Sequence, residues 1–162
     1  MAAADYFLKI SGVDGESTDS KHKGEIELES WSYGLTHTGG GHSGGGGGAG
    51  KAVFQDFHFV MKVSKASPKI FQACTTGEHL KDATLVARKA GKEQQEYLKI
   101  KLSEVLVSSY QQGGSVGEQI VPMDQVSFNF AKIEIEYREQ KSDGSLGGAV
   151  KGGFDLKQNK AI

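Results

Sequence analysis

Three long stretches of this 162-residue sequence alternate apolar with polar residues, and in each of them the alternation changes phase partway along. They span Glu25–His37, Tyr97–Tyr110 and Gln125–Tyr137; in the second, apolar residues stand at even positions up to Leu102 and at odd positions from Val105. Alternation predicts a β-strand with one buried face, and a slip of one residue exchanges the buried face for the exposed one. We therefore expect strands that bulge or bend, as two packed sheets closing into a barrel require, with pairs of separate short strands as the alternative.

Shorter segments complete a mainly β fold with a single helix. Further strands are predicted at Tyr6–Ile10, Lys51–Val63, Ala83–Lys89 and Gly153–Leu156. A short helix is predicted at Lys69–Thr75, because Ser67 and Pro68 suit the N-cap and the first helical position, and Gly77 suits the residue that ends it. The expected fold is a compact β-barrel of two packed sheets with one short α-helix, in a single domain over residues 1–162.

Glycine is concentrated in residues 38–50. Nine of the 23 glycines of the chain lie between Gly39 and Gly50, so we expect a flexible loop outside the core. Gly45–Lys51 also matches the first seven positions of a phosphate-binding loop. Ala52, however, stands where that motif needs a serine or threonine for magnesium, and a strand pattern rather than a helix follows. Nucleotide binding is therefore not expected.

No group of residues predicts catalysis, a metal site or a cofactor. The 5 histidines are scattered, and with a single cysteine they do not supply the spaced ligands of a zinc site. Cys74 stands near the C-terminal end of the predicted helix, where we expect it to pack against apolar neighbours rather than to act as a nucleophile. We therefore expect a protein that is not an enzyme and that binds no cofactor.

Charge and hydropathy limit the expected partners and location. The formal net charge of -1 gives no electrostatic reason to bind nucleic acid, and no run approaches the ~20 apolar residues that span a bilayer. Met1–Ile10 lacks the basic and apolar regions of a signal peptide, and a single cysteine is compatible with folding in a reducing cytoplasm. We expect a cytoplasmic protein without membrane insertion, which leaves the cell, if it does, without a cleaved signal.

Several blocks of the sequence, in their order and spacing, are more specific than any single glycine motif. They are GEIELESWSYG at Gly24–Gly34, GKAVFQDFHF at Gly50–Phe59, SPKIFQACTTGEHL at Ser67–Leu80, the stretch Ala83–Tyr110, and VSFNFAKIEIEY at Val126–Tyr137. Together they resemble the haemolysin-coregulated protein (Hcp) family of bacterial type VI secretion systems, from Tyr6 to about Asn159. The resemblance implies a compact barrel of two β-sheets with one α-helix packed at its side.

The resemblance also implies a structural, secreted protein. Members of this family form hexameric rings that stack into an inner tube, which a contractile sheath drives out of the cell together with a spike tip protein. The rings carry and shield small effector proteins in their lumen. A homo-hexamer is therefore expected, which is first cytoplasmic and then secreted to the extracellular space by the type VI pathway without a signal peptide.

Two sets of residues have expected roles in such a tube. Ser32 alternates with the bulky Trp31 and Tyr33; if these face the core, Ser32 faces the opposite way and would line the lumen and contact effectors. The glycine-rich loop would fold against the next ring of the stack, mobile in isolated rings and ordered in a tube. The residues of this expected ring-stacking loop are Gly39, Gly40, Gly41, His42, Ser43, Gly44, Gly45, Gly46, Gly47, Gly48, Ala49 and Gly50.

Two other functions remain open for a chain with this pattern. A tail-tube protein of a phage-like contractile injection machine would share the plan of barrel and ring. A monomeric β-barrel would instead bind a small ligand inside. A solution mass of about six chains would favour a ring over the monomeric barrel.

Overall fold

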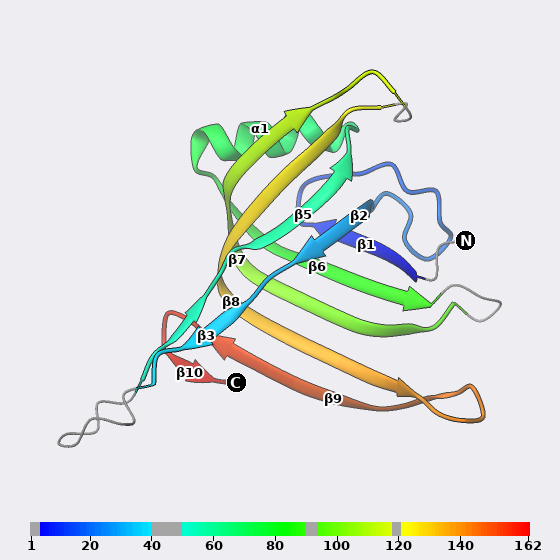
Figure 1. Ribbon diagram of the computed structural model, residues 1–162, viewed down its shortest axis with the longest axis vertical. Coiled ribbons are helices and arrows are strands. Elements are labelled where there is room, and N and C mark those ends of the chain that lie inside the picture. The colour runs from blue at the N-terminus through cyan, green and yellow to red at the C-terminus, as the bar shows by residue number, and fades with distance from the viewer. Residues whose placement is uncertain (1–3, 40–49, 90–93, 118–120) are drawn as a thin grey trace.

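The computed structural model describes residues 4–39, 50–89, 94–117 and 121–162, and Figure 1 shows their arrangement. The elements of these residues follow one another as β1 (Ala4–Ile10), β2 (Ile26–Ser32), β3 (Leu35–His37), β4 (Ala52–Phe54), β5 (Phe57–Lys62), α1 (Ala66–Thr76), β6 (His79–Lys89), β7 (Glu96–Gly113), β8 (Met123–Gln140), β9 (Leu146–Asp155) and β10 (Lys160–Ala161).

Six strands close into an antiparallel barrel in the order β1–β2–β5–β8–β7–β6, and the pairing of β6 with β1 completes the ring. β9 and β10 continue the sheet from β8, and β3 and β4 form a separate two-stranded ribbon that projects away from the barrel (Figure 1). The predicted mainly β barrel with one helix is confirmed. The two expected sheets join into one hydrogen-bonded sheet, which closes where β7 pairs with β8.

The change of phase in β8 coincides with a change of neighbour. β8 pairs with β5 up to Phe128 and with β9 from Lys132 onward. Between these positions, the carbonyl group of Ala131 accepts a hydrogen bond from the backbone N–H of Leu156 at 2.8 Å, while on β7 Glu104 adopts a positive φ of 51°. Both strands continue through this level, so the prediction of bent strands is confirmed for them.

The predicted strands at 25–37 and 51–63 each divide in two. β2 and β5 belong to the barrel, whereas β3 and β4 leave it together as the ribbon. At the junction, the backbone N–H of Gln55 donates to the carbonyl of Gly34 at 2.8 Å, so both segments turn out of the barrel at the same level. In the first of these segments the expected bulge is present, since the register of β2 against β5 shifts between Leu28 and Ser30, where the alternation changes phase. The separate short strands of the alternative arise further along, where β2 ends and β3 begins.

β9 is longer than the last strand predicted, Gly153–Leu156. Its first residues, LGGAVKGG from Leu146, are rich in glycine and hardly alternate, so the sequence carries no strand signal there. They form a strand because they pair with the second half of β8.

The helix α1 begins before the predicted N-cap. Lys65 occupies the N-cap position without a capping side chain of its own, and its backbone N–H donates instead to the carboxylate of Glu16 at 2.9 Å. Ser67 lies inside the helix, where its hydroxyl donates to the buried Asp124, so the prediction that Ser67 caps the helix is wrong. Gly77 ends the helix in the left-handed region with φ of 69°, as predicted.

Apolar side chains fill the interior of the barrel. Phe57, Phe59 and Phe128 are fully buried, and the rings of Phe59 and Phe128 meet edge to face with centroids 5.0 Å apart. Ile70 and Ala73 bury the inner side of α1, which lies beside the barrel (Figure 1). The helix at the side of the barrel is therefore as expected.

A buried carboxylate ties α1 to the barrel. Asp124, at the start of β8, accepts hydrogen bonds from the hydroxyl of Ser67, from the hydroxyl of Tyr110 at 2.9 Å and from the side-chain amide of Gln112 at 3.0 Å. Burial, together with the neighbouring Asp124, raises the pKa of the Tyr110 phenol. One fully buried acidic side chain thus joins β7, β8 and the helix.

The connection between β1 and β2 folds back over Phe7. The ring of His22 stacks on the ring of Phe7 with centroids 4.3 Å apart, and the buried guanidinium of Arg88 lies 4.7 Å from the centre of the Phe7 ring. Arg88 also pairs with Asp19 and Asp5. The hydrogen bond from Arg88 holds the pKa of the Asp19 carboxyl well below its ordinary value of 3.8.

Candidate functional site

Ser32 is the last residue of β2 and is exposed, whereas its neighbour Trp31 packs against the core. The indole ring of Trp31 stacks with Phe57 at a centroid distance of 6.0 Å and meets Tyr6 edge to face at 5.9 Å. Because side chains alternate along a strand, this aromatic contact directs Ser32 outward. The orientation agrees with the one expected from the sequence.

Strand pairing brings small polar side chains of four strands into one row with Ser32. Ser32 lies opposite His58 of β5, His58 lies opposite Ser127 of β8, and Ser127 lies opposite Ser109 of β7. Residues directly opposite in antiparallel strands share one face of the sheet, so this row crosses the outside of the barrel. The Nδ1 atom of His58 lies 3.1 Å from the hydroxyl oxygen of Ser127.

A second row runs beside the first and widens the same surface. Ser30 lies opposite Val60, Val60 opposite Gln125, and Gln125 opposite Gln111. We call the two rows together the polar face; its residues are Ser30, Ser32, His58, Val60, Ser109, Gln111, Gln125 and Ser127. None of them is a lysine, arginine, aspartate or glutamate, so the polar face offers hydrogen bonds rather than ion pairs.

One carboxylate lies at the edge of the polar face. Asp56 stands immediately before β5 and is partly buried. The hydroxyl of Ser108 donates to one carboxylate oxygen at 2.5 Å, and the side-chain amide of Asn129 donates to the other at 3.3 Å. The Ser108 hydroxyl also lies 3.1 Å from the carbonyl oxygen of Ser127. These contacts with β7 and β8 hold the Asp56 carboxylate in a fixed position beside the face.

These serine, histidine and aspartate residues do not form a nucleophilic triad. In such a triad the histidine accepts the serine proton while the carboxylate holds the other nitrogen of the ring. Here Asp56 accepts from Ser108 and Asn129 and not from His58, so among the described residues no carboxylate orients the imidazole as a base toward Ser127. The arrangement is suited to binding polar groups and not to activating a nucleophile.

The described ends of the expected ring-stacking loop, Gly39 and Gly50, follow directly on the β3–β4 ribbon. The backbone N–H of Thr38 donates to the carbonyl of Lys51 at 3.2 Å, and the N–H of Lys51 lies 3.3 Å from the Thr38 hydroxyl, which closes the ribbon. Gly50 packs so tightly that a Cβ there would lie 2.0 Å from the carbonyl oxygen of Thr38. Of the expected loop residues, the structure describes Gly39 and Gly50, and residues 40–49 lie outside the described residues.

Most residues of the polar face were not predicted as site residues. His58 alternates with Phe57 and Phe59, and Ser127 alternates with Val126 and Phe128, so the sequence predicted that both would face outward. It did not show that β5 lies between β2 and β8 and pairs with both. That neighbourhood places His58 and Ser127 in line with Ser32.

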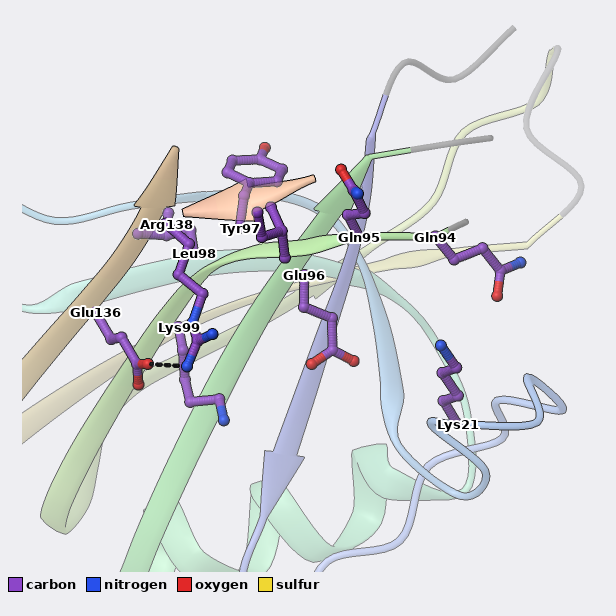
Figure 2. A pocket seen from close by; sticks show the side chains of 10 residues that line it. Lys21, Gln94, Gln95, Glu96, Tyr97, Leu98, Lys99, Glu136 and Arg138 are labelled. Atoms are coloured by element: carbon purple, nitrogen blue, oxygen red, sulfur yellow. Dashed lines mark hydrogen bonds and ion pairs between the residues drawn. The ribbon is translucent and has the colours of Figure 1, made fainter. Parts of the chain in front are cut away.

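A separate open pocket lies between the start of β7 and the second half of β8, and Figure 2 shows its lining side chains. Charged groups of both signs line it, among them Lys21 and Lys99. The acidic groups already have partners, since Glu136 pairs with Arg138 at 3.4 Å and Glu96 pairs with His22 outside the lining at 2.8 Å. This mixed lining indicates no single class of ligand, and it includes none of the predicted site residues.

The part of the chain that the structure describes contains neither a cluster of metal ligands nor a membrane-spanning helix. In that part of the chain, no three histidine, cysteine, aspartate or glutamate side chains come together as metal ligands. None of its helical structure is both long and apolar enough to cross a bilayer. Cys74 is partly buried against the core, which confirms that it packs.

Comparison with known proteins gives one consistent match. The family model described as type VI secretion system effector, Hcp, matches residues 7–137. The chain is 47% identical over 159 residues to the protein hcp1 of Pseudomonas aeruginosa, and these residues cover 97% of this chain and 98% of that protein. The crystal structure of Hcp1 from Salmonella typhimurium is 37% identical, with a TM-score of 0.85 over 99% of this chain and 100% of the other. A structure of a type six secretion system protein reaches a TM-score of 0.92 at 30% identity with the same coverage. This chain therefore belongs to the Hcp family of type VI secretion system proteins.

Proposed function

We propose that this protein forms hexameric rings that stack into the inner tube of a type VI secretion system, with the polar face lining the lumen and contacting small effector proteins. The observation that carries the proposal is the continuous row from Ser32 through His58 and Ser127 to Ser109, which crosses four strands of the barrel. A broad surface of small, uncharged polar side chains can hold many different cargo proteins loosely through hydrogen bonds and bridging water.

Two further surfaces suit contacts within such a tube. The outer edge of β9 pairs with β10 only at Phe154 and Asp155, so within the described residues its earlier backbone groups have no partner strand. An open strand edge is a surface that a neighbouring subunit can cover. The β3–β4 ribbon projects from the barrel and carries Gly39 and Gly50 at its end, where the next ring of the stack would meet it (Figure 1).

In this proposal the assembled tube has a sheath around it and a spike tip protein at its end. The rings form in the cytoplasm and leave the cell with their cargo through the type VI pathway. The protein acts by assembly and binding, without catalysis and without a cofactor.

Light scattering coupled to size-exclusion chromatography tests the ring directly. We expect a mass of about six chains, and electron microscopy of the same sample should show rings with a central opening. A monomer at high protein concentration would contradict the proposal. Because Phe57, Phe59 and Phe128 fill the barrel, the monomeric ligand-binding barrel has less support, whereas a tail-tube protein would give the same mass.

Substitution of Ser32 tests the lumen contact. Ser32→Gln places a longer side chain in the first row of the polar face, next to His58, and should lower both the stability and the export of co-expressed effectors. Ser142→Gln, at an exposed turn after β8, is the matched control and should change neither. Unchanged effector stability and export in the Ser32→Gln variant, with intact rings, would show that Ser32 does not contact cargo.

A further inference from the structure

Asp56 has only neutral hydrogen-bonding partners among the residues that the structure describes. Within the described residues, no lysine, arginine or histidine forms an ion pair with its carboxylate, and its partners are the neutral groups of Ser108 and Asn129. The basic side chain of Lys62, at the end of the strand that follows Asp56, pairs instead with Glu29 at 3.7 Å. Asp56 is partly buried as a residue, while the hydrogen bonds to its carboxylate lie at an exposed position that a partner can reach.

The neutral donors orient this carboxylate but leave part of its hydrogen-bond-accepting capacity unused. Each oxygen of an ionised carboxylate can accept two hydrogen bonds, and Asp56 receives one at each oxygen from its side-chain partners. A group that is already held in place loses little conformational freedom when it binds. The planar guanidinium of arginine, with its paired donors, matches such a carboxylate better than a neutral amide does.

We propose that Asp56 is the cation-binding position of the effector contact surface, where it accepts an arginine or lysine side chain of the cargo protein. This inference rests on the proposed lumen role of the polar face. Ser32, His58 and Ser127 would bind neutral groups of the same cargo surface, while Asp56 selects a basic residue at the edge. The face thus favours cargo that presents a basic residue surrounded by small polar ones.

Two short peptides probe this preference, acetyl-Gly-Ser-Arg-Ser-Gly-amide and the same peptide with glutamine in place of arginine. Their binding to the assembled protein can be followed by saturation-transfer difference NMR at low salt. We expect the arginine peptide to bind about threefold to fivefold more tightly, as one exposed charge-assisted contact provides. Raising the salt concentration should reduce the difference, because partly exposed charges are screened.

Variants separate Asp56 from other acidic groups. Asp56→Asn keeps an oxygen acceptor for Ser108 and should remove the preference for arginine. Asp143→Asn is the matched control, because Asp143 also accepts two hydrogen bonds, both from Ser145, but in the turn between β8 and β9. It should leave the preference unchanged. Ser108→Ala retains the charge but loosens the carboxylate, and should weaken the preference without abolishing it.

The same samples distinguish this inference from the proposed function when their mass is measured. Equal binding of the two peptides to intact wild-type rings, or a preference that survives Asp56→Asn, would overturn the assignment of Asp56. Rings that fall apart in the Asp56→Asn variant would also overturn this assignment. The cation that pairs with Asp56 would then belong to a neighbouring copy of the chain and not to the cargo. A wild-type monomer that prefers arginine through Asp56 would refute the ring but support the cation-binding position.

Discussion

At the scale of single residues, the barrel depends on a few buried polar groups whose partners come from distant parts of the sequence. Asp124 and Arg88 are both buried, and each has several hydrogen-bonding partners. Neither was predicted from the sequence, because their partners lie far from them along the chain. Burial of a charged group is tolerated only when such partners are present.

Replacing Asp124 should destabilise the protein strongly. Asp124→Ala leaves the donors of Ser67, Tyr110 and Gln112 without their common acceptor in a buried site, and each unpaired donor is unfavourable. We expect the free energy of unfolding to fall by about 2–4 kcal/mol in urea denaturation. Asp14→Ala, at an exposed position, should change it by less than about 0.5 kcal/mol. Equal denaturation midpoints for both variants would show that Asp124 does not tie the helix to the barrel.

The Asp19–Arg88 pair should make stability depend on pH on the acidic side. The folded-state pKa of Asp19 is lowered, so its contribution is complete above the ordinary value of 3.8 and is lost as the pH falls through the lowered value. The thermal midpoint of the wild type should therefore exceed that of Asp19→Asn at about pH 7, and this difference should shrink toward about pH 2. A difference that stays constant across this range would contradict a role for the ionised carboxylate.

At the scale of strands, the sequence predicted where the chain alternates but not always how it pairs. The phase changes in β7 and β8 were recognised as bends because the apolar pattern resumes after each slip. The division of the first predicted strand into β2 and β3 was left open, since Gly34 interrupts the pattern no more clearly than a bulge would. The start of β9 was not predicted, because its glycines give no alternating pattern. It forms a strand through its pairing with β8.

The site was predictable to a similar extent. Ser32 follows from alternation beside Trp31, combined with the family resemblance. His58, Ser127 and Asp56 join it only through the order of strands in the barrel, which pairs β2 with β5 and β5 with β8. Strand order depends on contacts between segments far apart in sequence, and alternation within one segment does not report them.

The end of the β3–β4 ribbon, where Thr38 contacts Lys51, predicts different effects for Gly39 and Gly50. Gly50→Ala places a methyl group against the carbonyl of Thr38 and should break the contact between Thr38 and Lys51. We expect amide exchange at Thr38 to become at least about tenfold faster. Gly39→Ala, which meets nothing within 4 Å, is the control and should leave this exchange unchanged. Similar exchange rates in the two variants would show that the end of the ribbon tolerates a side chain at Gly50.

At the scale of the whole molecule, the barrel and the ribbon have separate roles. The barrel contains the core and presents the polar face, whereas the ribbon projects from it and is anchored where Phe54 contacts Phe130 and Phe154. A formal net charge of -1 leaves little repulsion between copies of the chain. These features suit the proposed tube, in which the ribbon would contact the next ring.

Stacking of rings should therefore be visible in hydrogen exchange of the ribbon end. We expect the amides of Gly39–Gly50 to exchange at least about tenfold more slowly in assembled tubes than in isolated rings, because contact with the next ring would exclude water and restrict the backbone. The turn at Ser142–Gly144, between β8 and β9, serves as an internal reference, since no stacking role is proposed for it. If the exchange of Gly39–Gly50 stays as fast in tubes as in rings, this segment does not form the contact between rings. The open edge of β9 would then be the surface to test next, because its unpaired backbone could make a contact between subunits without the ribbon.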